Sequence, residues 1–159
     1  MEKYPWWWIS GQNLLFVIFF GLGYVLLSPI KVSNIPIIAI LYVAFLAVML
    51  LIVLRKHLCT NCYYYGKWCS TGWGKLSSLM FKEKSGNYKL GIKLAGITWG
   101  VGTALPIILG IIPAIKNHFL LLIWIVFLLL TPVVMFAHKK SCERCKMRDI
   151  CPASMAQPK

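Results

Sequence analysis

The sequence predicts an all-α integral membrane protein with four transmembrane helices. Its residues are 59% hydrophobic and only 13% charged, whereas soluble domains contain about 25% charged residues. Only helices and closed barrels satisfy all their backbone polar groups inside a bilayer. Because the apolar segments are continuous rather than alternating in polarity, we expect helices.

Four apolar segments are long enough to cross the hydrocarbon core, which takes about 20 residues. We expect spans at residues 14–29, 35–54, 94–115 and 119–137 of a single membrane domain, 1–159. Pro36 suits the first turn of the second span, where a helix needs no backbone N–H. On the third span, Gly96 and Gly100 form a pair of small residues that we expect to pack closely against a neighbouring helix.

Basic residues are distributed unequally between the two sides that four spans define. Lys31 and Lys116 lie on one side, and the other 15 of the 17 lysines and arginines lie on the other. Since cytoplasmic loops carry the excess of basic residues, we expect a multi-pass protein of the cell membrane. Both termini, a cysteine-rich loop (55–93) and a cysteine-rich tail (138–159) should then be cytoplasmic. This orientation accounts for the net charge of +13, and no nucleic-acid recognition motif accompanies it.

The loop 55–93 contains a short amphipathic segment after Gly72. One face of a helix there would carry Trp73, Leu76, Leu79 and Met80. Two interpretations carry equal weight: a short helix that lies in the membrane interface, or an ordinary loop packed on the bundle.

Six cysteines form two triads, and each triad follows a pair of spans. The spacings are C-x2-C-x6-C and C-x2-C-x5-C, and corresponding cysteines are 83, 83 and 82 residues apart. This pattern favours two tandem helical hairpins, each followed by a cytoplasmic triad at the same membrane depth. The triads are Cys59, Cys62 and Cys69, and Cys142, Cys145 and Cys151.

Metal ligation is the interpretation that we favour for all six cysteines. A C-x2-C turn aims two thiolates at one ion, as in zinc and iron–sulfur sites. The cytoplasm keeps thiols reduced, and we expect the neighbouring lysines and arginines to lower the pKa values of these thiols. The abundance of cysteine, the Cys151-Pro152 ending and the aromatic surroundings favour an iron–sulfur cluster over zinc.

The number of cysteines limits the possible clusters. Because a cluster normally takes four cysteines, six cannot hold two all-cysteine [4Fe–4S] clusters. Either one cluster draws ligands from both triads, or each triad holds a cluster with a non-cysteine or partner ligand.

Two alternatives remain open. Zinc could be bound by three cysteines and one histidine in each half, with His57 and His138 as the histidines, in a non-enzymatic scaffold or assembly factor. Both histidines also suit helix ends, where they would meet the last carbonyls.

In the other alternative, the chain is a thiol–disulfide oxidoreductase. Its four helices and paired cysteines resemble the architecture of disulfide-bond-forming quinone reductases and vitamin K epoxide reductases, whose active cysteines face the oxidising side.

Other chemistries lack the residues that they need. No expected span contains a charged residue, which argues against a proton-coupled transporter or pump. No Walker loop, Ser/His/Asp pattern or zinc-protease motif is present. We therefore expect a membrane-anchored, metal-binding protein that acts in electron transfer or redox sensing at the cytoplasmic face. Its partners would be the lipid bilayer and other subunits of a membrane complex; the sequence does not establish whether it is an enzyme.

Overall fold

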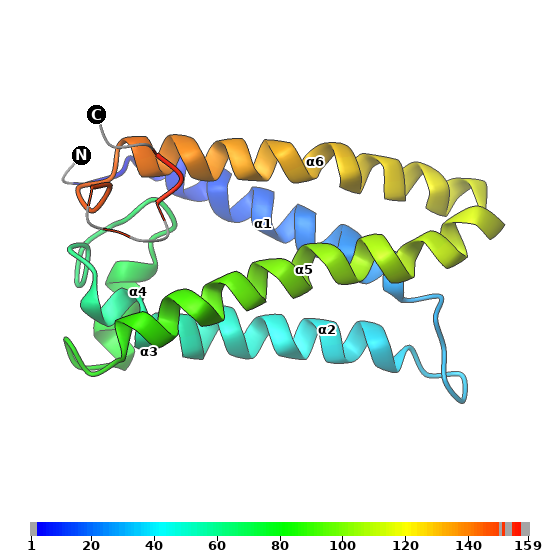
Figure 1. The fold of residues 1–159 in the computed structure, drawn as a ribbon, viewed down its shortest axis with the longest axis horizontal. Coiled ribbons are helices and arrows are strands. Elements are labelled where there is room, and N and C mark those ends of the chain that lie inside the picture. Colours follow the sequence, from blue (N-terminus) through cyan, green and yellow to red (C-terminus); the bar gives the residue numbers. More distant parts are fainter. Residues whose placement is uncertain (1–2, 150, 152–153, 157–159) are drawn as a thin grey trace.

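The computed structural model describes residues 3–149, 151 and 154–156, whose regular elements are all helical and include no strand. By length and composition, four helices can cross a membrane, as a multi-pass membrane protein requires. They lie alongside one another in one bundle (Figure 1). The all-α architecture and its four candidate spans are thus confirmed. In chain order the elements of the bundle are α1 (Trp6–Leu27), α2 (Ile37–Val48), the π-helical turn η1 (Met49–Val53), α3 (Leu54–His57), the 3₁₀ turn η2 (Cys59–Asn61), α4 (Trp73–Met80), α5 (Tyr88–Lys116) and α6 (His118–Glu143).

The second span is composite, since α2, η1, α3 and η2 follow one another from Ile37 to Asn61. It therefore reaches beyond residue 54 and includes Arg55, the first basic residue after the apolar segment.

α5 and α6 begin at side-chain caps. The side chain of Asn87 accepts a hydrogen bond from the N–H of Leu90 at 3.1 Å, and that of Asn117 accepts one from Phe119 at 2.9 Å. Such caps satisfy backbone donors that the first turn of a helix leaves free.

α1 contacts all three other spans and contributes buried residues to two hydrophobic clusters of the bundle. The rings of Phe19 and Phe127 stack with centroids 4.5 Å apart and join α1 to α6. The second span is tied to α5 by the Tyr42 hydroxyl, which donates to the carbonyl oxygen of Gly102 at 2.9 Å.

The expected close packing at Gly96 and Gly100 is wrong. A Cβ atom added at either position would meet no atom within 4 Å outside its own helical turn. Both glycines instead line a cavity. Close approach occurs at Gly23, where an added Cβ would lie against the Tyr42 hydroxyl and 3.0 Å from the Pro106 ring.

The amphipathic segment of the loop is a helix, α4, as one of the two interpretations required. Its small residues face the bundle: a Cβ at Gly74 would collide with the carbonyl oxygen of Tyr64, and the Ser77 hydroxyl donates to the carbonyl oxygen of Arg55 at 3.1 Å. Leu79 and Met80 are exposed. This arrangement suits a helix that lies along a membrane interface.

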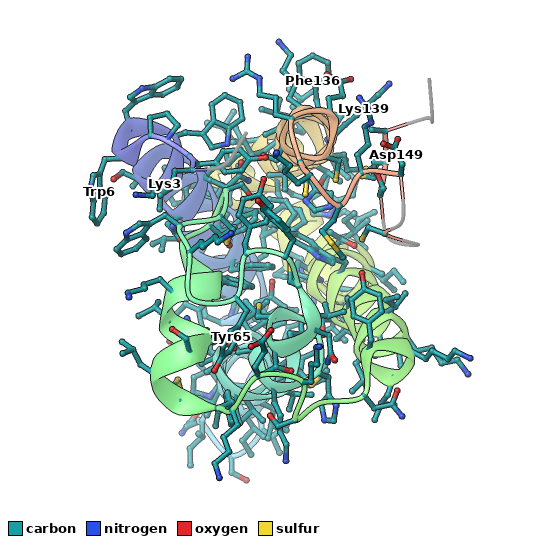
Figure 2. All side chains as sticks on the ribbon, turned by 90° about the vertical axis from the view of Figure 1, so that its left-hand side faces the viewer. Lys3, Trp6, Tyr65, Phe136, Lys139 and Asp149 are labelled. Carbon is teal, nitrogen blue, oxygen red and sulfur yellow. The ribbon has the colours of Figure 1, made fainter. Side chains whose placement is uncertain are left out.

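The first described residues before α1, the segment 144–149 after α6 and the loop after the second span lie at one end of the bundle (Figures 1 and 2). The N–H of Tyr4 donates to the carbonyl oxygen of Trp68 at 3.2 Å, and the Tyr4 hydroxyl donates to that of Ser141 at 2.8 Å. Three segments distant in sequence are thereby joined. This end, which carries all six cysteines, is called the cysteine end below.

Candidate cysteine site

An aromatic cluster at the cysteine end contacts members of both triads. Its buried residues are Tyr4, Ile9 and Tyr64, and the rings of the two tyrosines lie 5.9 Å apart. Packed against it are Trp8, Trp68, Cys62, Cys69 and Cys145. Two cysteines of the first triad and one of the second therefore share one apolar environment.

Tyrosine hydroxyls connect the triads further. Tyr64 lies two residues after Cys62, and its hydroxyl accepts a hydrogen bond from the N–H of Lys146, the residue after Cys145, at 3.3 Å. The hydroxyl of Tyr88, at the start of α5, donates to the sulfur of Cys151 at 3.4 Å. Each triad is therefore held by groups from a distant part of the sequence.

The two triads fold into corresponding turns. The N–H of Cys62 donates to the carbonyl oxygen of Cys59 at 3.3 Å, and the N–H of Cys145 donates to that of Cys142 at 3.0 Å. In both triads, the carbonyl oxygens of the second and third cysteines each accept from the N–H three residues later. The two triads thus share this pattern of backbone hydrogen bonds, although Cys59 lies in the 3₁₀ turn η2 and Cys142 in the last turn of α6.

Backbone N–H groups point at several sulfur atoms. The N–H of Met147 donates to the sulfur of Cys145 at 3.4 Å, and that of Gly74 donates to the sulfur of Cys69 at 3.4 Å. For Cys62, a hydrogen bond from the backbone of Tyr64 opposes the rise in its pKa. Hydrogen bonds of this kind stabilise a thiolate and tune the potential of thiolate-bound clusters.

Burial dominates the acidity of these thiols. It raises the pKa of Cys62 to about 11, with further contributions from Cys69, Cys145 and Cys151. The pKa of Cys145 is also raised, again mainly by burial. The expectation that neighbouring basic residues lower thiol pKa values is therefore wrong at these two positions. The nearby ammonium groups instead lie over an aromatic ring: that of Lys67 is 4.2 Å from the ring of Tyr63.

The two histidines occupy different environments. The Nε2 atom of His138 lies 3.7 Å from the sulfur of Cys142, one helical turn away. The Nδ1 atom of His57 accepts a hydrogen bond from the N–H of Asn87 at 3.1 Å and so helps to fix the start of α5. Only His138 is hydrogen-bonded to a cysteine of its own triad.

The cysteines are gathered at one end without surrounding a single point. Within 3–149, 151 and 154–156, no three or more His, Cys, Asp or Glu side chains are close enough together to hold a metal ion. All six cysteines are free and partly exposed. Pro152, which favoured an iron–sulfur ending, lies outside the described residues. A metal would therefore require the cysteine turns to move closer together.

An apolar cavity of about 630 Å³ lies next to the first triad, between the four spans. Its walls include Phe16, Trp99, Gly96 and Gly100, and Cys59 and His138 lie at its cysteine end. The two glycines leave this space open because their missing side chains would project into it.

Arg55 is a residue whose environment sequence reasoning missed. It was expected in a cytoplasmic loop, but it lies in α3 and is only 7% exposed. The π-helical turn before it has no recognisable sequence pattern, so the direction of this side chain was not predictable.

No family model matches the chain, and neither the curated proteins nor the solved structures include a significant match. A function must therefore be inferred from the residues of the chain itself.

Proposed function

We propose that the chain is a membrane-anchored metal-binding protein whose cysteine triads hold an iron–sulfur cluster. It would act in electron transfer or redox sensing at the cytoplasmic face, as a subunit of a larger membrane complex. The observation that carries this proposal is the packing of cysteines from both triads on one aromatic cluster. Cysteine thiolates are the ligands that iron–sulfur clusters require.

A single cluster shared between the triads agrees best with this packing. Cys62, Cys69 and Cys145 already contact the same aromatic residues, and two of them receive backbone N–H···S hydrogen bonds at 3.4 Å. The fourth ligand would come from the remaining three cysteines. Six cysteines are enough for the four ligands of one cluster, and two cysteines then remain unused.

The site differs from a preformed metal cage, and the difference has a physical consequence. Protonated, half-buried thiols must lose protons when they bind a cation, so affinity for metal rises with pH. Binding would also draw the cysteine turns together. We therefore expect metal to order the cysteine end and to stabilise the whole chain.

The tandem organisation and the orientation belong to the same proposal. Two helical hairpins, each followed by a triad with the same turn, are supported by the corresponding backbone hydrogen bonds. Cytoplasmic placement of the triads is supported by the excess of basic residues at the cysteine end.

A second candidate is a zinc-stapled, non-enzymatic scaffold or assembly factor. The 3.7 Å approach of His138 to Cys142 favours it, because three cysteines and one histidine form a common structural zinc site. His57 does not support the same arrangement in the first half, since its Nδ1 atom is already hydrogen-bonded to Asn87.

Metal and acid-labile sulfide analysis of protein purified without oxygen tests both candidates. Iron with matching sulfide and visible absorbance is the expected result; Cys62→Ala and Cys145→Ala should each abolish it. Ser85→Ala, an exposed change in the same loop, should retain it. Zinc without sulfide would replace the first candidate by the second. Protein that binds neither metal would refute both and leave thiol–disulfide chemistry.

A further inference from the structure

Arg55 is a buried cation at the end of the second span. Its Nε atom has no hydrogen-bond partner among the described residues. Its Nη1 atom lies 4.0 Å from the sulfur of Met80, and its Cζ atom lies 5.6 Å from the ring centroid of Trp73. Neither contact provides an oxygen acceptor. A buried guanidinium N–H without an acceptor is costly, especially at the edge of a membrane.

The chain has little means of neutralising this charge. It contains 4 acidic residues against 17 lysines and arginines. In the described part of the chain, the ion pair joins Arg148 to Asp149, and Arg55 has no carboxylate partner. Cys59 and Cys69 lie near enough to act electrostatically on Arg55, but it forms no hydrogen bond with either. No described residue therefore supplies an oxygen acceptor to this guanidinium.

A groove leads from Arg55 along the outside of the bundle. It has a volume of about 480 Å³ and lies between α1 and the second span, with Arg55 and Trp73 at one end. Its walls are almost entirely apolar. Val17 and Leu51, which line it, are 69% and 49% exposed, so the groove opens outwards, where lipid would surround the spans.

The length of the groove matches one leaflet. Val43 and Arg55 both line it and are 12 residues apart, which corresponds to about 18 Å at 1.5 Å per residue. Half of a hydrocarbon core of about 30 Å is about 15 Å. An acyl chain would therefore extend from the level of Arg55 to about the middle of the membrane.

The π-helical turn η1 (Met49–Val53) helps to place the guanidinium. The N–H of Leu54 donates to the carbonyl oxygen of Met49, five residues earlier. One additional residue in a helix rotates all later residues by about 100°. Without this turn, the Arg55 side chain would leave the helix in a different direction and would not lie at the end of this groove.

We propose that Arg55 binds the phosphate of an anionic membrane lipid, with one acyl chain of that lipid in the groove between α1 and the second span. A guanidinium matches phosphate oxygens in geometry and charge and forms paired hydrogen bonds with them. The Nε atom supplies one of these donors. The basic cysteine end attracts anionic lipids in general, whereas Arg55 provides a buried site for one of them. The lipid proposal does not require a metal at the cysteines.

The groove favours a lipid over free phosphate as the ligand of Arg55. A soluble anion would use Arg55 and leave the apolar walls exposed. A lipid uses both, since the guanidinium and the walls belong to one continuous surface.

Native mass spectrometry of the full chain, titrated with phosphatidylglycerol or phosphatidylcholine in detergent, tests the site. The unmodified chain should bind phosphatidylglycerol preferentially, and Arg55→Gln should weaken this binding about tenfold or more, as expected for loss of a charge-assisted hydrogen bond. Lys56→Gln is the matched control, because Lys56 is adjacent, carries the same charge and is exposed. Equal losses in the two variants would refute the site and leave only general attraction by a basic surface.

A change in the groove separates a lipid from a free anion. Ala47→Trp fills the groove without altering charge, and it should also weaken phosphatidylglycerol binding about tenfold. Inorganic phosphate at millimolar concentration should displace little of the lipid. Undiminished binding by Ala47→Trp, or complete displacement by inorganic phosphate, would overturn the lipid proposal. Because Ala47→Trp leaves Arg55 in place, it still tests the lipid proposal if Arg55→Gln does not fold.

Discussion

The hydrogen bond from Tyr42 to Gly102 compensates for a proline, and this gives a sharp prediction. In an α-helix the carbonyl oxygen of Gly102 would accept from the N–H of residue 106, but residue 106 is a proline and has no N–H. The Tyr42 hydroxyl occupies this position, donating to Gly102 at 2.9 Å from the neighbouring helix. Tyr42 is 2% exposed, so water does not reach the pair.

Tyr42→Phe should therefore leave a buried carbonyl oxygen without a donor. This costs about 1–3 kcal/mol in proteins generally, and single hydrogen bonds between transmembrane helices contribute about 0.6 kcal/mol on average and up to about 1.7 kcal/mol. We expect a loss of about 1–2 kcal/mol in the free energy of unfolding. Tyr24→Phe is the control, because its ring is 38% exposed on the surface of α1 and its change should have almost no effect.

The decisive measurement is a double-mutant cycle with Pro106→Ala, followed by reversible unfolding in detergent. Alanine at residue 106 restores the N–H that Gly102 lacks, so Tyr42→Phe should lose most of its cost in that background. A coupling of about 1 kcal/mol is expected. If Tyr42→Phe were equally destabilising with proline and with alanine at residue 106, the proposed compensation would be refuted.

Two further predictions concern packing and orientation. Gly74→Ala should destabilise the chain by about 3 kcal/mol, because the new Cβ would collide with the carbonyl oxygen of Tyr64. Gly96→Ala should leave the stability equal or slightly higher, since nothing lies within 4 Å of its added Cβ. Thermal unfolding of the two variants compares them, and equal losses of stability would contradict this packing. In intact cells, a membrane-impermeant maleimide should label Ser33→Cys, in the turn opposite the cysteine end, and should not label the unmodified chain. Labelling of the unmodified chain, whose six cysteines all lie at the cysteine end, would show that the orientation is inverted.

The spans could be predicted because the bilayer imposes a length and a composition. Their ends could not, because hydropathy reports the hydrocarbon core and not the hydrogen bonds of the helix. α1 begins at Trp6 rather than near residue 14, and α5 begins at Tyr88, next to the capping side chain of Asn87. The caps were visible in the sequence, but polar residues beside an apolar segment are too common for a cap to be chosen in advance.

The spacing of small residues correctly predicted a shared face on the third span, but the prediction that this face packs against a neighbouring helix was wrong. Gly96 and Gly100 do share a face, as their four-residue separation requires. That face borders a cavity rather than a helix. Spacing within one helix contains no information about the distance to the next helix, which depends here on bulky side chains such as Phe16 of α1, on the other side of the cavity.

The common end of the two triads was predictable from the even number of spans, but the relation between the triads was not. It depends on contacts across the sequence, such as that between the Tyr64 hydroxyl and the N–H of Lys146. The acidity of the thiols was misjudged for a related reason. Sequence proximity to lysines suggested lowered pKa values, yet burial against the aromatic cluster raises the pKa of Cys62 and Cys145.

α4 connects the two proposed sites, since it contacts both the first triad and the buried arginine. The N–H of Gly74 donates to the sulfur of Cys69, while the Ser77 hydroxyl donates to the backbone of Arg55 and the ring of Trp73 lies beside its guanidinium. Because the contacts to both lie within one eight-residue helix, a displacement of α4 would alter the cysteine end and the groove between α1 and the second span together. The loop between the second and third spans is therefore a structural part of the bundle. Its small residues at 74 and 77 allow it to lie close enough to contact both the first triad and Arg55.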